Sequence, residues 1–175
     1  MKSLLSLFGL GSSQDESTKD TATVRRILAE LEHLDTDRAR YIAAFAYALS
    51  RVAHADLTIT ADEVTAMETI VREHGKLPEA QAVLVVEIAR HQAELFGGTE
   101  NFQVIRQLRD LANETQQTEI IDALFAVAAA DGSIGAEEET QIRLIADELG
   151  LSRGRYIDLR SRWNEQRSVI QRLDG

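Results

Sequence analysis

Carboxylates recur at two points 75 residues apart in the chain. Asp131 and Glu138 stand seven residues apart, and Asp56 and Glu63 repeat that spacing in the first half. Carboxylate oxygens are the ligands that hard divalent cations prefer in proteins. Acidic side chains that lie close together repel one another, so a bound cation would stabilise them. If the two segments meet in the fold, these four residues form one cation site, with Ca²⁺ or Mg²⁺ favoured.

The second acidic segment resembles the back half of an EF-hand calcium loop. Residues 131–134 read Asp-Gly-Ser-Ile and are followed by Glu138, which matches the late ligand positions of that loop. Val127 and Ala129 stand where the first two acidic ligands belong, and neither can coordinate calcium. One copy is therefore no complete EF-hand, and a site would need both copies.

The same carboxylates have a structural alternative. Glu63 follows Thr60 by three residues, which is the pattern of a capping box at the start of a helix. Glu138 stands in the same relation to Gly135. Acids in a first helical turn also interact favourably with the helix dipole. The two aspartates would then fold their turns through local backbone bonds. The sequence leaves both interpretations open.

The carboxylates belong to an internal repeat of helix, turn and helix. Residues 48–77 align without a gap to residues 123–152, and thirteen of the thirty pairs are identical. Each copy predicts an alanine-rich helix, an aspartate, a turn with a buried isoleucine, and a second helix with a glutamate in its first turn. Gly75 and Gly150 are predicted as left-handed caps. We expect the copies to pack about a pseudo-twofold axis.

Apolar residues recur at helical spacing along the rest of the chain, and no segment alternates with the period of two of a strand. The sequence predicts an all-α domain over residues 21–175, after a flexible segment over residues 1–20. The expected helices cover about 21–34, 38–55, 60–75, 78–95, 99–113, 118–130 and 136–149, and a single last helix capped by Ser152 carries Tyr156, Leu159, Trp163 and Ile170 in one stripe.

Charge and composition narrow the range of partners. The net charge of −10 argues against nucleic acid, and the lack of cysteine excludes disulfides and thiolate metal sites. We expect a cytoplasmic protein with a protein partner, and residues 1–10 could contact the inner membrane surface through Leu4, Leu7 and Phe8.

The basic segment 151–175 is interpreted as a solvated helix face, with docking on the acidic remainder as the alternative. Its arginines are Arg153, Arg155, Arg160, Arg162, Arg167 and Arg172.

The acidic turn also carries a family resemblance. Residues 129–134 read Ala-Ala-Asp-Gly-Ser-Ile, and with Glu138, Ile145 and Gly150 they are similar to the signature of the TerB family, the tellurite-resistance helical domain related to the N-terminal region of DjlA co-chaperones. The resemblance covers about residues 38–165. It implies a bundle of about seven or eight helices, a role in tellurite and stress resistance, and metal binding. The residues that correspond to the family's acidic positions are Asp56, Glu63, Asp131 and Glu138. In the first copy Leu57 replaces the glycine of the family pattern, which weakens that half-site.

No pattern in the chain indicates an enzyme. Phosphate-binding loops, nucleophile elbows and zinc-protease motifs are absent from the sequence. Glu30-x-x-His33 matches the di-iron pattern once, whereas such a site needs the pattern on two helices. We expect a non-enzymatic protein that binds a divalent cation in a stress response. A metal-free helical scaffold for protein interactions is the alternative.

Overall fold

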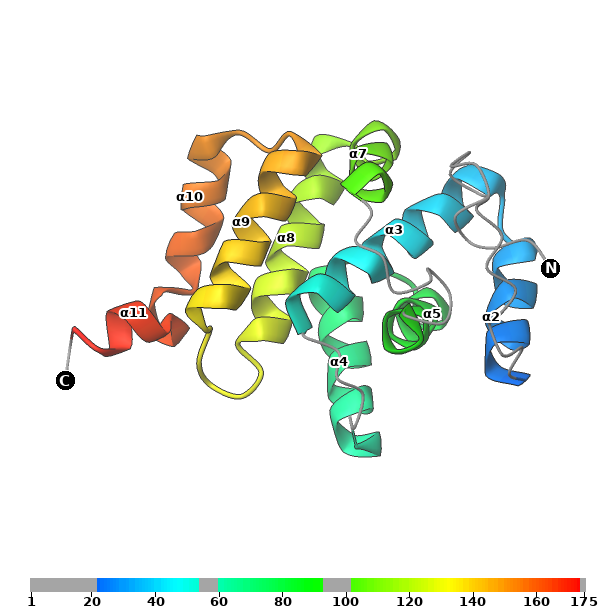
Figure 1. Ribbon diagram of the computed structural model, residues 1–175, viewed down its shortest axis with the longest axis horizontal. Helices are drawn as coiled ribbons and strands as arrows, with labels where there is room; N and C mark the ends of the chain where they lie inside the picture. The colour runs from blue at the N-terminus through cyan, green and yellow to red at the C-terminus, as the bar shows by residue number, and fades with distance from the viewer. Residues whose placement is uncertain (1–21, 54–59, 93–101, 174–175) are drawn as a thin grey trace.

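The computed structural model describes residues 22–53, 60–92 and 102–173, and these ranges are helical, with one isolated β-bridge and no strand. The all-α prediction is confirmed, whereas the expected flexible segment 1–20 lies outside the described residues. None of the described helices is both long and apolar enough to cross a membrane. The helices are α2 (Ala22–Glu32), α3 (Thr36–Ala53), α4 (Ala61–His74), α5 (Glu79–Arg90), α7 (Phe102–Leu111), α8 (Glu114–Ala128), α9 (Ala136–Leu149), α10 (Arg153–Arg162), the 3-10 helix η1 (Asn164–Gln166) and α11 (Ser168–Gln171) (Figure 1).

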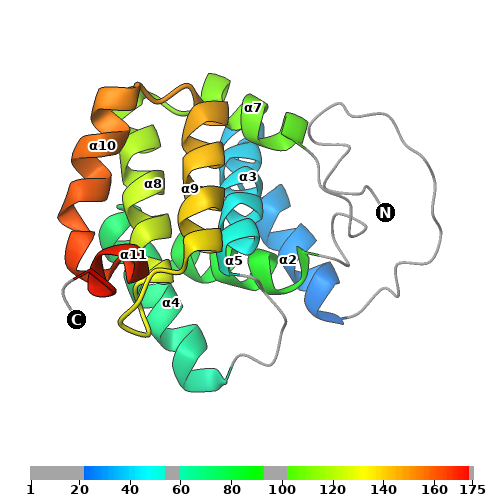
Figure 2. The same ribbon diagram turned by 60° about the vertical axis from the view of Figure 1, so that its left-hand side comes forward.

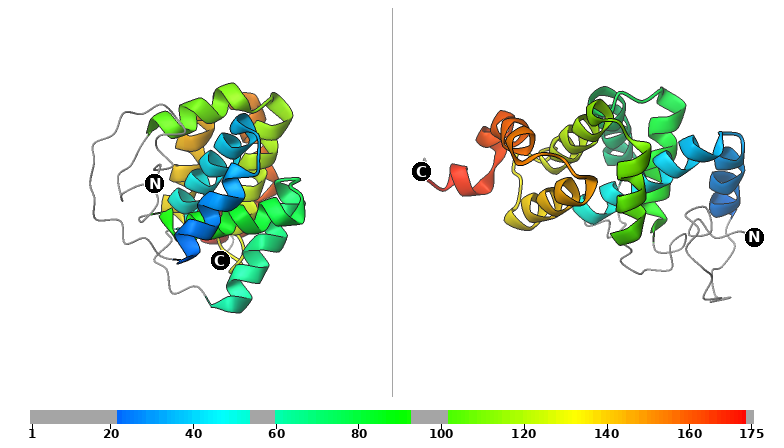
Figure 3. Two further views of the ribbon diagram at one scale, coloured as in Figure 1. Left: turned by 90° about the vertical axis from the view of Figure 1, so that its right-hand side faces the viewer. Right: turned by 90° about the horizontal axis from the view of Figure 1, so that it is seen from above.

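Helix α3 is the centre of the bundle. It packs against α5, α7, α8 and α9, while α4 packs against α5 and α8. Helices α8, α9 and α10 stand side by side in two views (Figures 1 and 2). Seen from above, α2 and α11 occupy opposite ends of the molecule (Figure 3). The C-terminal helices therefore extend the bundle beyond α8 and α9.

Alanine-rich sequence explains why α3 and α8 are the most buried helices. Residues 41–49 of α3 and residues 123–128 of α8 are buried without interruption. Alanine side chains let neighbouring helices approach closely, and the space between them is filled by a few large residues. Phe45 and Phe125 are both fully buried. Such helices bury apolar surface on every side, which is the main source of the bundle's stability.

Local sequence sets several helix ends where it predicts them. The Thr60 hydroxyl accepts a hydrogen bond from the Glu63 N–H at the start of α4, and Ser152 caps α10 in the same way. Gly150 ends α9 with φ +79°, the left-handed conformation that glycine adopts without strain. Helix α8 begins four residues before the predicted start, because Asn113 and Gln116 form a capping box there.

The predicted left-handed cap at Gly75 is wrong. Gly75 has φ −77°, and the left-handed residue is Lys76, with φ +52°. Glycine is needed at position 75 because there is no room for a side chain. A Cβ atom there would lie 2.5 Å from the Val71 carbonyl oxygen and 3.0 Å from Cε1 of Phe45. The repeat therefore conserves the residue type at two positions that need it for different physical reasons.

Two predicted helices end earlier than expected. Helix α5 ends at Arg90 and not at Leu95. The single last helix is replaced by α10, η1 and α11: α10 ends at Arg162, and the chain is extended at Arg167, with ψ 120°, between η1 and α11. That extended residue lets the neighbouring backbone pair with Ile134, which no helix could do. The tertiary contact outweighs the helical periodicity of the segment.

The two sequence copies correspond to α3 with α4 and to α8 with α9. In the second copy α9 packs along α8, and α9 also contacts α3 of the first copy. Arg51 of α3 and Glu148 of α9 form an ion pair of 2.9 Å across this contact, with side chains 10% and 17% exposed. The copies are therefore joined directly, whereas the pseudo-twofold axis stays a prediction.

Candidate functional site

The turn between α8 and α9 carries Asp131 at its exposed edge. The Asp131 carboxylate accepts a hydrogen bond of 3.0 Å from the Ser133 N–H. Gly132 follows with φ +95°, where a side chain would be strained. Ile134 is fully buried and fixes the turn to the core. The aspartate thus folds the turn through a local backbone bond, as the structural alternative predicts, while its side chain remains in solvent.

Glu138 closes the other end of the same turn. Its Oε2 accepts a hydrogen bond of 2.7 Å from the Gly135 N–H, and the side chain is half-buried. Gly135 is the N-cap of α9. Glu138 therefore makes one of the two bonds of a capping box, the bond from the N-cap backbone N–H to the glutamate side chain. The capping role that the sequence indicates is confirmed for Glu138.

Glu63 has the corresponding position at the start of α4. Its Oε2 accepts hydrogen bonds of 2.7 Å from the Thr60 N–H and 2.8 Å from the Thr60 hydroxyl. Both bonds favour the charged carboxylate, and they lower the pKa of Glu63 below 4.5, with the backbone bond as the larger cause. The capping box predicted at Thr60 is confirmed.

Thr60→Val provides a test of this assignment. The variant removes the hydroxyl bond and keeps the backbone N–H, so the pKa of Glu63 will rise only part of the way toward 4.5. Because a lowered pKa in the folded state stabilises the charged form, the contribution of Glu63 to stability is present above pH 4.5 and is lost as the pH falls through the folded pKa. Carbon-detected NMR titration of the Glu63 carboxylate in both proteins measures the difference. A pKa unchanged by the substitution would contradict the hydroxyl contribution.

The four predicted cation ligands are only partly described by the structure. The N-terminal end of α4, which carries Glu63, and the α8–α9 turn lie on the same side of the molecule (Figures 1 and 2). Asp56 falls outside the described residues. Among the described residues, no three histidine or acidic side chains are grouped so that they could hold a metal ion. The shared site of Asp56, Glu63, Asp131 and Glu138 therefore stays a prediction.

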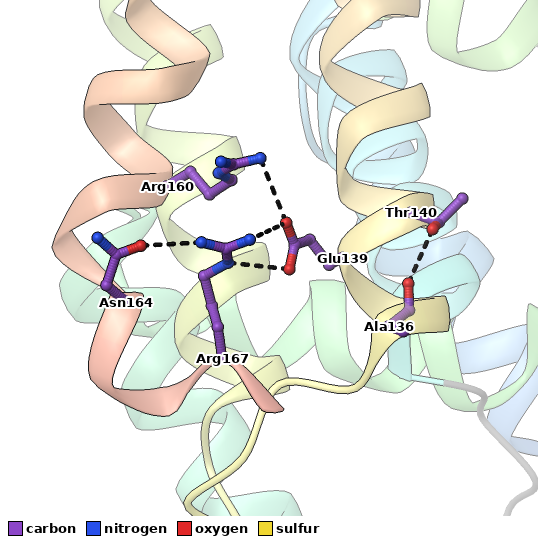
Figure 4. Close-up of polar contacts among 6 residues, drawn as sticks. All are labelled: Ala136, Glu139, Thr140, Arg160, Asn164 and Arg167. Atoms are coloured by element: carbon purple, nitrogen blue, oxygen red, sulfur yellow. Dashed lines mark hydrogen bonds and ion pairs between the residues drawn. The ribbon is translucent and has the colours of Figure 1, made fainter. Parts of the chain in front are cut away.

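An ion-pair network centred on the buried Arg167 lies next to the acidic turn (Figure 4). Arg167 donates to both carboxylate oxygens of Glu139, at 2.9 and 2.8 Å, and to Oδ1 of Asn164 at 3.0 Å. Arg160 approaches the same carboxylate at 3.5 Å. Arg167 is only 8% exposed, so the interpretation of the basic segment as a solvated face is wrong for this residue. The alternative, docking on the acidic remainder, is confirmed for it.

Sequence patterns gave no signal for this pairing. Glu139 and Arg167 are 28 residues apart and belong to different elements, so no helical spacing connects them. Arg153, Arg162 and Arg172 are exposed, as predicted for a solvated face. Arg155 is also exposed but forms an ion pair of 3.0 Å with Glu114. Arg167 differs from them by its backbone bridge with Ile134, and that tertiary contact has no local pattern in the sequence.

A second polar cluster joins α4, α8 and the residue after α10. Nδ1 of His74 lies 2.7 Å from one oxygen of Asp122, and the Trp163 indole N–H donates to the other oxygen at 3.1 Å. The rings of His74 and Trp163 are 5.6 Å apart. All three side chains are partly buried. The cluster fixes the start of the C-terminal segment to the first and second copies of the repeat.

Comparison with known proteins decides the family. A sequence model of the family described as "Tellurite resistance protein TerB" matches residues 41–161, well over half of the 175 residues. The chain belongs to the TerB family. No curated protein and no solved structure matches it. The TerB match begins in α3 and ends in α10, so it contains both acidic segments of the sequence. It stops before Trp163 and Arg167, whereas their partners Asp122 and Glu139 lie within it.

Proposed function

We propose that this TerB-family protein is not an enzyme and that it binds a divalent cation between its two acidic segments, in a stress response of the tellurite type. The proposed ligands are Asp131 and Glu138 in the second copy, with Asp56 and Glu63 in the first. Family membership supports the general role. The conformation of the α8–α9 turn supports the cation site.

That conformation is the observation on which the proposal depends. In an EF-hand loop the fifth, seventh and twelfth residues supply ligands, and a glycine at the sixth makes the sharp turn. Asp131 corresponds to the fifth position, left-handed Gly132 to the sixth, and Glu138 to the twelfth. The exposed aspartate and the half-buried glutamate thus stand at the two ends of one turn of this kind.

The donor set favours a hard cation. Calcium takes six to eight oxygen ligands and tolerates irregular geometry, whereas Mg²⁺ keeps several of its waters. One turn supplies too few oxygens for calcium, so the first copy and water would complete the shell. The α4 end that carries Glu63 lies on the same side of the molecule as the turn, which supports such sharing (Figure 1).

Thermal unfolding with and without cation tests the proposal. A ligand that binds only the folded state stabilises it by RT ln(1 + [L]/Kd), which is about 2.7 kcal/mol at a hundred times Kd. For a domain of this size, we expect a rise in Tm of roughly 5–10 °C. The measurement uses millimolar Ca²⁺, Mg²⁺ and Zn²⁺ in turn, on the full chain, against a chelator blank.

The decisive variant is Asp131→Asn with Glu138→Gln. Asparagine still forms the turn bond and glutamine still caps the helix, so the fold is kept while two ligand charges are lost. The proposal expects the Tm shift to disappear in this variant. Asp37→Asn with Asp110→Asn is the matched control, since it removes two charges from side chains that are 76% and 75% exposed. A shift that persists in the first variant, or disappears in both, contradicts the assigned ligands.

A wild-type Tm that none of the three ions changes would instead support a metal-free scaffold for a protein partner. The capping bonds of Glu63 and Glu138 favour that second function, because they give both carboxylates a structural role without any ion. Contact of residues 1–10 with a membrane surface is a separate proposal. Pelleting of the full chain and of a chain without those residues with liposomes tests it.

A further inference from the structure

The segment from Trp163 to Leu173, here named the C-terminal strap, lies against the acidic turn. The Ile134 N–H donates to the Gln166 carbonyl at 2.6 Å, and the Ser168 N–H donates to the Ile134 carbonyl at 3.0 Å. These two bonds enclose Arg167 in a parallel bridge with Ile134. The backbone of the turn is therefore paired with a segment that follows it by more than thirty residues.

Side chains of the strap hold the turn at further points. Gln171 Nε2 donates to the Gly132 carbonyl at 3.2 Å, and the Ser133 hydroxyl bonds to Gln171 Oε1 at 3.2 Å. Beside them, the paired bonds from Arg167 to Glu139 fix the strap to the first turn of α9 (Figure 4). Charge-assisted bonds of this paired kind are among the stronger polar contacts in proteins. The strap thus contacts both ends of the region that holds Asp131 and Glu138.

Other features oppose the docked position. The Tyr156 hydroxyl and Gln166 Oε1 are buried and have no hydrogen-bond partner in the described part of the chain. Burial raises the pKa of Tyr156, and the neighbouring Glu139 carboxylate adds to the rise. A buried polar atom without a partner is costly, and water would satisfy Gln166 Oε1, which belongs to the strap, if the strap opened. Val169 and Leu173, at the end of the strap, are 47% and 77% exposed and add little apolar burial.

We propose that the C-terminal strap is a releasable clamp that sets the conformation of the acidic turn. When it is docked, Gly132 and Ile134 are held and the turn is ordered. When it is released, the turn loses its backbone partners while the bundle of α3, α5, α8 and α9 stays folded. Arg167 and Gln171 act as positioning residues. If the proposed cation site exists, the docked strap is its binding form, and cation and strap stabilise each other by thermodynamic linkage.

Hydrogen exchange of individual amides in the cation-free protein tests the clamp. The probes are the Ile134 and Ser168 N–H groups, which bond across the contact. Arg167→Ala will speed their exchange by at least tenfold, while buried amides of α3 and α5 keep their wild-type rates. Arg167→Lys retains the charge and loses the paired geometry, so its rates will lie between the two. Arg162→Ala is the matched control, because it removes an exposed arginine of the adjacent helix and will leave the probes unchanged.

Two results overturn the clamp. One is exchange of Ile134 and Ser168 in Arg167→Ala that is less than tenfold faster than in the wild type. The other concerns the case in which Arg167→Ala speeds exchange equally at every amide. Gln171→Ala is then the deciding variant, because it removes only surface contacts. We expect Gln171→Ala to speed exchange at Ile134 at least threefold, with Arg172→Ala as its control, and an unchanged rate rejects the clamp.

Adding Ca²⁺ or Mg²⁺ separates this inference from the proposed function. Slower exchange at Ile134 and Ser168 with the ion, absent in Asp131→Asn with Glu138→Gln, supports both. If the ions have no effect on any amide while Arg167→Ala still releases the probes, the clamp stands and the cation site is rejected.

Discussion

Replacing Phe45 with alanine will lower the free energy of unfolding by about 3–5 kcal/mol, as truncation of a buried aromatic side chain does elsewhere. Phe45 is fully buried in α3, the helix that packs against most of the bundle. Its ring meets Tyr41 edge-on at 6.3 Å and covers Gly75 at the end of α4. Urea unfolding followed by circular dichroism measures the change.

Two further variants test whether the loss of stability in Phe45→Ala comes from the lost packing of its ring. Leu144→Ala shortens a side chain that is 36% exposed and will cost far less. Gly75→Ala will destabilise the wild-type protein, because the new Cβ would lie 3.0 Å from Phe45 Cε1. In the Phe45→Ala background the same change will cost less, since the contacts with the Phe45 ring are gone and only the one with the Val71 carbonyl oxygen remains. Additive costs would show that Gly75 and Phe45 do not interact as described.

Arg51→Ala will have the second largest effect, a loss of about 3–5 kcal/mol, because removal of one partner leaves the other charge buried without compensation. Arg51 pairs with Glu148 at 2.9 Å and also donates to Gln141 at 3.2 Å. Both charged side chains are at most 17% exposed, so water screens the pair weakly. Denaturant unfolding of the variant at neutral pH provides the measurement.

A double variant separates the loss of the ion pair from the loss of packing. Arg51→Met with Glu148→Leu removes both charges and keeps apolar volume, and it will be much closer to wild type than Arg51→Ala. Arg143→Ala serves as the control, because its partner Asp147 is 4.0 Å away and the two side chains are 55% and 68% exposed. Such exposed pairs contribute little. If Arg51→Ala behaves like Arg143→Ala, the contact between α3 and α9 is not held by this pair.

Helix ends with local causes could be predicted from the sequence. Thr60, Ser152 and Gly150 act through residues within one turn of themselves, so their roles can be recognised from short patterns. Gly75 could not be distinguished from Gly150, because its requirement comes from Phe45, thirty residues earlier and on another helix. The extended conformation of Arg167 between η1 and α11 is similar, since the backbone on both sides of it pairs with Ile134. Contacts between distant segments leave no periodic trace in a single sequence.

In the candidate site, too, only the partners that are close in the sequence could be predicted. The capping bonds of Glu63 and Glu138 could be predicted, because each bond spans three residues. The pairing of Glu139 with Arg167 could not be, although it adjoins the acidic turn. Neighbouring acids in the run 137–139 thus have different partners, and only folding separates Glu139, which Arg167 binds, from Glu138, which caps the helix.

Trp163 is the only tryptophan of the chain, and its position makes it a natural spectroscopic reporter. Its indole bonds to Asp122 of α8, its ring lies beside His74 of α4, and the strap begins at this residue. The fluorescence of Trp163 therefore reports on the junction at which α4 and α8 meet the C-terminal segment, and no added label is needed. A fragment cut at the family boundary, residue 161, would lose that signal together with the junction.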